Sequence, residues 1–152
     1  MNFITRGIIL IVTISCSNNG IIIADPIIGT WKPVKEVGFV IDGTPVSIES
    51  TPCEQTSRYI LTANGNFTYS EFHEETGGGC VPDESYIIDG TWAKLPTGQY
   101  QFDFNYFNAQ TQQTESDSQT PDKVTFSNNN STMRIIELVD EGEEYIEYVR
   151  VN

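Results

Sequence analysis

Residues 99–106 alternate polar with aromatic side chains, and this alternation limits the fold more than any other feature of the sequence. Rings occupy every second position: Tyr100, Phe102, Phe104 and Tyr106. Successive side chains of a β-strand point to opposite faces, so the four rings share one face and the polar groups share the other. The segment therefore predicts a strand of a sheet with one apolar and one polar face.

The rest of the chain repeats this theme in short runs. From Ile27 onward, segments rich in β-branched and aromatic residues recur roughly every 8 to 12 residues, which is typical of all-β domains. Turn dipeptides such as Asp42-Gly43 and Asn64-Gly65 tolerate positive φ and predict hairpins. The predicted strands are 27–41, 45–49, 58–63, 66–73, 85–94, 99–108, 123–127, 132–139 and 144–151.

These runs predict an all-β, antiparallel up-and-down meander of about eight or nine strands in one domain over residues 26–152. A meander of this length has exposed edges, and closure into a barrel removes them. An open barrel or a β-sandwich is the alternative. The polar segment 110–122 is expected to form a long exposed loop or a frayed hairpin, and helix should be minor.

Residues 1–15 have the pattern of a cleaved signal peptide. One positive charge at Arg6 precedes a short apolar run, which predicts export and is too short to span a bilayer as a helix. A small residue then precedes Cys16, as in a lipobox, where the cysteine is acylated before cleavage. We expect Cys16 to carry lipid and residues 16–25 to form a tether. Cleavage after Ala24, with release of a soluble protein, is the alternative.

The chain has three cysteines, an odd number for an oxidising compartment. Assigning Cys16 to lipid leaves Cys53 and Cys80 as an even pair, for which we expect a disulfide. Such a bridge would stabilise the domain by roughly 3 to 4 kcal/mol in the chain-entropy account. A reactive or metal-binding thiol pair is the weaker alternative, because no CxxC motif is present.

The tripeptide Gly-Thr-Trp occurs twice, at residues 29–31 and 90–92. The order of motifs along the chain is export signal, GTW, Cys53, Asn64-Gly65-Asn66-Phe67, Cys80, GTW and a closing Tyr148-Val149-Arg150. This order resembles the lipocalin-like domain family of Bacteroidota lipoproteins over nearly the whole chain after Cys16. The second GTW and the many large aromatic residues depart from classical lipocalins.

The resemblance implies roles for two residues and a location for the protein. Trp31 would plug one end of a barrel, and Arg150 from the last strand would pack across it through a cation–π contact. A lipoprotein of this family would be held at the outer membrane. Residues 17–20 lack the acidic residues of surface-exported lipoproteins, so the periplasmic face is expected, with the cell surface or secretion as alternatives.

The interior of such a barrel is either filled by its side chains or able to hold one small ligand. Core packing is one interpretation of the aromatic face. In the other, an apolar pocket contacts a small hydrophobic ligand, with tyrosine hydroxyls orienting it. The candidate pocket residues are Phe67, Tyr69, Ile88, Tyr100, Phe102, Phe104, Tyr106 and Phe126.

The charge balance excludes one class of partner and suggests another. The chain has 8 Lys and Arg against 21 Asp and Glu, a net charge of −13. Such a field repels nucleic acid, whose recognition needs clustered cations. The acidity provides solubility, or alternatively an acidic surface that docks a cationic envelope protein onto a fully packed barrel.

The sequence offers little for catalysis. His73 is the only histidine and precedes two glutamates at a predicted strand end, where solvated polarity is the common role. No nucleophile elbow, HExxH motif or phosphate loop is present, and the acidic turn 140–144 lacks EF-hand spacing. We therefore expect a membrane-anchored ligand-binding module with no enzymatic activity, cofactor or metal, and a scaffolding protein is the alternative.

Overall fold

A computed structural model describes residues 24–151 except 109, and for residues 84–87 only the backbone. The predicted signal peptide and Cys16 lie outside the described residues. The described chain forms one sheet of ten antiparallel strands with a single short 3-10 helix. None of its helical segments is long and apolar enough to cross a membrane. The predicted all-β antiparallel meander is confirmed.

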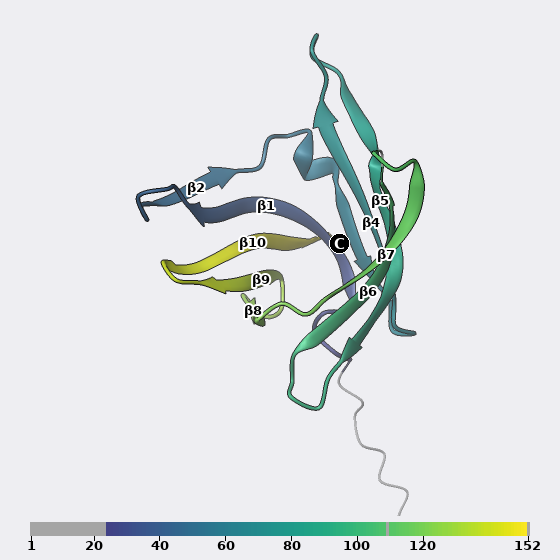
Figure 1. Cartoon of the computed structure of the whole chain (residues 1–152). Helices are drawn as coiled ribbons and strands as arrows, with labels where there is room; N and C mark the ends of the chain where they lie inside the picture. Colours follow the sequence, from purple (N-terminus) through teal and green to yellow (C-terminus); the bar gives the residue numbers. More distant parts are fainter. Residues whose placement is uncertain (1–23, 109, 152) are drawn as a thin grey trace, which may run out of the picture.

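The strands follow one another mostly as hairpins (Figure 1). The elements are β1 (Gly29–Phe39), β2 (Pro45–Glu49), η1 (Glu54–Thr56), β3 (Arg58–Leu61), β4 (Asn66–Glu74), β5 (Cys80–Lys94), β6 (Tyr100–Asn108), β7 (Gln113–Gln119), β8 (Lys123–Ser127), β9 (Thr132–Val139) and β10 (Gly142–Val151). Their order across the sheet is β7-β6-β5-β4-β3-β1-β10-β9-β8, and β2 pairs with the distal part of β1. The first strand thus pairs with the last, and Trp31 lies opposite Arg150.

The sheet curls into a half-barrel that stays open at one seam. Strands β7 and β8 are consecutive in the chain, yet they lie at opposite ends of the strand order and form no ladder with each other. Figure 1 shows the result: β2, β1, β10, β9 and β8 form one wall, and β4 to β7 form the other. Of the architectures expected from the sequence, the open barrel is therefore the one observed.

Two segments differ from their predicted form. Strand β5 begins at Cys80, five residues before its predicted start at 85, because residues 80–82 pair with the end of β4. Backbone pairing there outweighs the low strand propensity of Pro82 and Asp83. In the polar segment 110–122 the hairpin expectation is the correct one. It contains β7, which hydrogen-bonds β6 through side chains as well, with Ser116 donating to Asn105 at 2.7 Å.

The core lies on the concave face, where the alternation in β6 places its rings. Tyr100 and Phe102 are buried, whereas Asp103 between Phe102 and Phe104 is exposed. Each large apolar side chain removed from water contributes roughly 1.5 to 3 kcal/mol. The buried cluster consists of Ile27, Trp31, Tyr59, Leu61, Phe67, Tyr100, Phe102, Met133 and Tyr148.

Candidate functional site

One end of the half-barrel is closed by Trp31 and Arg150. The Trp31 side chain is fully buried, and its indole N–H donates to the carbonyl oxygen of Ile27 at 2.8 Å. The Arg150 guanidinium carbon lies 4.2 Å from the centre of the Trp31 ring. This guanidinium also donates to the carbonyl oxygens of Ile28 and Pro26 at 2.6 and 2.8 Å. The two residues named from the lipocalin resemblance therefore lie in contact at one end of the sheet.

Both Gly-Thr-Trp glycines lie where a side chain does not fit. A Cβ on Gly29 would collide with the Arg150 guanidinium. A Cβ on Gly90 would lie 2.7 Å from the Phe67 ring and 2.9 Å from the Cβ of Phe104. The glycines thus allow Arg150 to reach Trp31, and they allow two rings of the concave face to pack across β5.

Two of the candidate pocket residues belong to this closed end. The Tyr100 hydroxyl donates to Asp25 Oδ1 at 2.6 Å, and Lys94 pairs with the other oxygen of that carboxylate at 3.1 Å. Burial and this hydrogen bond raise the pKa of Tyr100 to about 12. Phe126 packs between Trp31 and Tyr100, with ring centres 6.2 and 6.5 Å away. Neither ring lines the three compartments of the open part of the interior.

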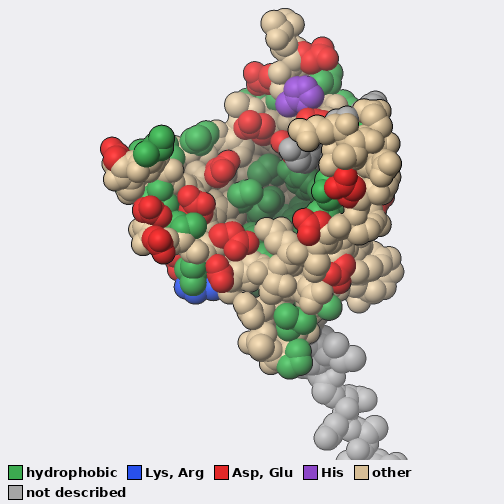
Figure 2. Space-filling model, viewed as in Figure 1, with side chains coloured by type: hydrophobic (Ala, Val, Ile, Leu, Met, Phe, Trp, Pro, Cys, Tyr) green, Lys and Arg blue, Asp and Glu red, His purple; other side chains and the backbone are tan. Residues whose placement is uncertain are grey.

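The other end is an open cleft between the two walls. Figure 2 shows hydrophobic side chains gathered in this hollow, with acidic side chains around it. Three adjoining compartments of about 180, 240 and 370 Å³ make up the cleft, and Ile146 borders all of them. Only the 370 Å³ compartment reaches by itself the roughly 300 to 1,000 Å³ of a typical small-molecule site, and the two smaller compartments adjoin it. The most apolar compartment is lined by Tyr59, Phe67, Tyr69, Ile88, Phe102, Phe104, Gln119, Ile135, Ile146 and Tyr148.

Five of the eight candidate pocket residues line this apolar compartment: Phe67, Tyr69, Ile88, Phe102 and Phe104. Tyr106 lies on the same face of β6 but does not line the cleft, and its hydroxyl donates to Glu115 on β7 at 2.9 Å. The alternation of side chains along a strand shows which face a residue occupies, but it does not show how far along the barrel the residue lies. The sequence therefore groups Tyr106 with residues that do reach the cleft.

Half of the residues that line the apolar compartment were not among the candidates from the sequence. Tyr59, Ile135, Ile146 and Tyr148 complete the apolar walls, and Gln119 on β7 reaches across the open seam to donate to Glu137 at 3.3 Å. The four apolar residues could have been found from the sequence, because each is two positions from another large apolar residue of its strand and therefore shares that residue's face. Gln119 carried no such signal, since it lies on a polar edge strand.

Two tyrosine hydroxyls in the cleft have no hydrogen-bond partner among the described residues. Tyr59 and Tyr148 are only 8% and 7% exposed. Among the described residues, no side-chain nitrogen or oxygen atom is both fully buried and without a hydrogen-bond partner. The two unpartnered hydroxyl oxygens are therefore not fully buried, and they open onto the cleft that both tyrosines line. Burial raises the pKa of Tyr59 well above its usual value, and the nearby Tyr148 and Tyr69 raise it further. Both hydroxyls are thus neutral and available to a ligand.

Carboxylates continue the concave face toward the mouth of the cleft. On three strands, two inward positions with large apolar or aromatic side chains are followed by a glutamate two residues further toward the mouth. These series are Phe67-Tyr69-Glu71 on β4, Met133-Ile135-Glu137 on β9 and Tyr148-Ile146-Glu144 on β10. Glu36 and Glu54 add two more carboxylates to the lining. The cleft is therefore apolar at its base and acidic at its rim.

Glu71 is the rim carboxylate nearest the aromatic base. It accepts a hydrogen bond from the Tyr69 hydroxyl at 3.4 Å. Burial, reinforced by the neighbouring Asp83 carboxylate, raises the pKa of Glu71 despite that hydrogen bond. The structure therefore holds a partly buried acid whose ionised form is disfavoured.

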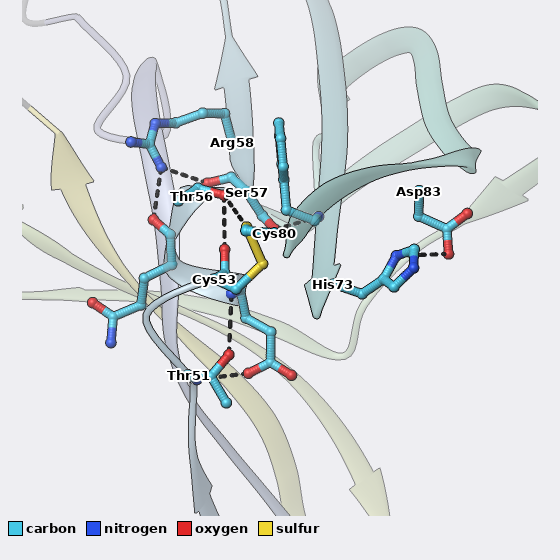
Figure 3. Close-up of a disulfide and its surroundings, with 11 residues drawn as sticks. Thr51, Cys53, Thr56, Ser57, Arg58, His73, Cys80 and Asp83 are labelled. Atoms are coloured by element: carbon cyan, nitrogen blue, oxygen red, sulfur yellow. Dashed lines mark hydrogen bonds and ion pairs between the residues drawn. A yellow bond between two sulfur atoms is a disulfide. The ribbon is translucent and has the colours of Figure 1, made fainter. Parts of the chain in front are cut away.

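The predicted disulfide is confirmed (Figure 3), and neither of its cysteines lines the cleft. Cys53, at the start of η1, is joined to Cys80, the first residue of β5, with Cα atoms 5.5 Å apart. His73 lies at the nearby end of β4, half exposed, with Nδ1 3.8 Å from Asp83 Oδ2. Within the described residues, no group of three or more His, Cys, Asp and Glu side chains is placed to hold a metal ion.

Comparison with known proteins adds no relative. No protein-family model matches the sequence, and no curated protein matches it. The resemblance to lipocalin-like lipoproteins stays a prediction, and the function of the protein is inferred from the cleft.

Proposed function

We propose that the protein is a membrane-anchored, non-enzymatic module that binds a small hydrophobic ligand in the cleft of the half-barrel. The observation that carries the proposal is the apolar compartment between the two walls, lined by aromatic and aliphatic side chains and bordered by tyrosine hydroxyls that have no partner among the described residues. An apolar cavity with a few convergent polar groups is the usual form of a small-molecule site. The sheet leaves this open cleft beside its packed core, which favours ligand binding over a fully packed scaffold.

A pair of matched variants tests the cleft. Ile146 borders all three compartments and is 39% exposed, and Ile60 on the outer face of β3 is 38% exposed. Tryptophan at position 146 fills the cleft, whereas tryptophan at position 60 adds the same bulk outside it. We expect saturable binding of Nile red, an uncharged apolar dye, to weaken about tenfold or more in Ile146→Trp and to persist in Ile60→Trp.

Two results would overturn this function. One is the absence of saturable Nile red binding to the native protein. The other is an equal loss in both variants, which would place the dye somewhere other than the cleft.

The anchor is a separate part of the proposal and has its own test. A lipid on Cys16 would hold the cleft at the outer membrane, on its periplasmic face, so that any cargo stays local to the membrane. Labelled palmitate should be incorporated into the native protein and not into Cys16→Ala. Equal labelling of both would place the lipid elsewhere, and no labelling of either would favour the released, soluble form.

A further inference from the structure

The rim of the cleft carries several carboxylates that no positively charged side chain of the described residues pairs with. Five glutamates line the compartments: Glu36, Glu54, Glu71, Glu137 and Glu144. None of them forms an ion pair with a Lys, Arg or His of the described chain, although Lys35 also borders the cleft. Glu137 and Glu144 lie directly opposite each other in the β9–β10 ladder, a like-charge arrangement that destabilises a sheet. The rim therefore carries an electrostatic cost that a bound cation would offset.

Tyr148 joins this acidic rim to the apolar base. Its ring belongs to the buried core, and its hydroxyl has no partner in the described chain. Glu36, Glu71 and Tyr148 line the same compartment of the cleft. Three oxygen acceptors thus converge where the apolar compartment meets the rim.

We propose that the ligand of the cleft is an amphiphile with a protonated amine: its apolar body contacts the aromatic base, and its ammonium group lies among Glu36, Glu71 and the Tyr148 hydroxyl. This inference depends on the ligand-binding function proposed above and names its chemical class. An ammonium group has three hydrogen-bond donors and no acceptor, which matches three oxygen acceptors. The ring of Tyr69 lines both the apolar compartment and the compartment with Glu36 and Glu71, and it can add cation–π attraction.

The same geometry disfavours the commonest apolar anions. A fatty acid could accept hydrogen bonds from the free tyrosine hydroxyls, but its carboxylate would then lie beside Glu36 and Glu71. Like charges in a partly desolvated site repel more strongly than in water. An uncharged alcohol of equal length avoids that repulsion and gains no ion pair, so its affinity should lie between those of the amine and the acid.

Displacement of Nile red by three decyl compounds tests the inference on the full-length protein. Decylamine, decanol and decanoate have the same apolar chain and differ in head-group charge at neutral pH. Below their micellar concentrations, we expect decylamine to displace the dye at a concentration about tenfold or more lower than decanoate requires, with decanol between them. Raised salt should narrow the difference, because part of the rim is exposed to solvent.

Charge-matched variants locate the ammonium. Glu71→Gln removes one rim carboxylate, and Glu36→Gln provides a second test should the first variant unfold. Glu49→Gln is the control, because Glu49 lies at the end of β2 and does not line the cleft. The preference for amine over acid should fall several-fold in the two rim variants and persist in the control.

The outcomes separate the two proposals. Saturable binding of Nile red and decanol with no preference for decylamine would overturn the amine inference and leave the ligand-binding function standing. Tighter binding of decanoate, or an undiminished preference in both rim variants, would do the same. Failure of the native protein to bind the dye and all three compounds would overturn both.

Discussion

The closed end and the open end of the half-barrel differ in whether their buried polar groups are hydrogen-bonded. At the closed end, Arg150 donates to three backbone carbonyl oxygens and Tyr100 donates to a charged Asp25. At the open end, the Tyr59 and Tyr148 hydroxyls have no partner in the described chain. A buried polar group without a partner costs stability. The difference indicates that the closed end stabilises the fold and that the open end is arranged for something outside the chain.

Truncation of the plug should have the largest effect. Trp31→Ala removes a fully buried side chain and leaves Arg150 without its ring, so the free energy of unfolding should fall by about 3 to 5 kcal/mol. Ile146→Ala, at a partly exposed position in the cleft, should cost less than about 1 kcal/mol. Guanidinium chloride unfolding measures both. Equal losses would break the division between a stabilising and a binding end.

Removal of one hydroxyl from each end gives a more selective comparison. Tyr100→Phe loses a hydrogen bond to a charged carboxylate and should cost roughly 1.5 to 3 kcal/mol. Tyr148→Phe loses no protein partner, so its free energy of unfolding should change by less than about 0.5 kcal/mol. The same guanidinium chloride titrations report both variants. A large loss in Tyr148→Phe would mean that its hydroxyl already has a stabilising partner.

The two ends should also respond oppositely to pH. Burial alone would raise the pKa of Asp25, but hydrogen bonds from Tyr100, the Ile27 amide and Lys94 lower it overall. Its contribution to stability is therefore complete above the unfolded pKa of about 3.9 and is lost as pH falls through the folded pKa. Glu71 has a raised pKa, so its ionised form costs stability above the folded pKa, and the cost disappears below about 4.3.

Two amide variants test the opposite effects of the Asp25 and Glu71 carboxylates on stability. At neutral pH, Asp25→Asn should lower the free energy of unfolding and Glu71→Gln should raise it, each by less than the changes above. The Glu71→Gln difference should shrink as the pH falls toward about 4.3, whereas the Asp25→Asn difference should persist down to about 3.9 and shrink only below it. Chemical unfolding between about pH 2 and pH 7, at about unit intervals, follows both differences. A stabilising Asp25→Asn, or a destabilising Glu71→Gln, would contradict the assignment of the two ends.

Most of the fold could be predicted from side-chain patterns, because period two and turn chemistry act locally. The face of β6 and the glycine turns at 43 and 65 follow from such signals, and the Cys53–Cys80 bridge follows from the even pair of cysteines that remains once Cys16 is assigned to lipid. For strand β7 the sequence does not decide between a loop and a hairpin, because its residues are polar. Cross-strand side-chain hydrogen bonds, as between Ser118 and Asp103, hold it to β6, and composition does not report them.

The cleft was predicted only in part, for a geometric reason. The sequence identifies which side chains face inward, but the height of each along the barrel depends on strand register. Tyr100 and Phe104 are on one face of one strand, yet the first belongs to the closed end and the second to the cleft. The rim glutamates were missed because acidic residues on an inward face contradict the expectation of an apolar interior.

The pairing of β1 with β10 also sets the order in which the fold can be completed. Strands β3 to β7 can form as successive hairpins between near neighbours in the chain. Trp31, in contrast, meets Arg150 only after almost the whole described chain has been closed into a loop. Such non-local contacts carry a loop-closure entropy that is recovered late, and they slow folding. Deletion of the last strand should therefore leave a collapsed hairpin array whose first strand has an unpaired edge, and not a shortened native domain.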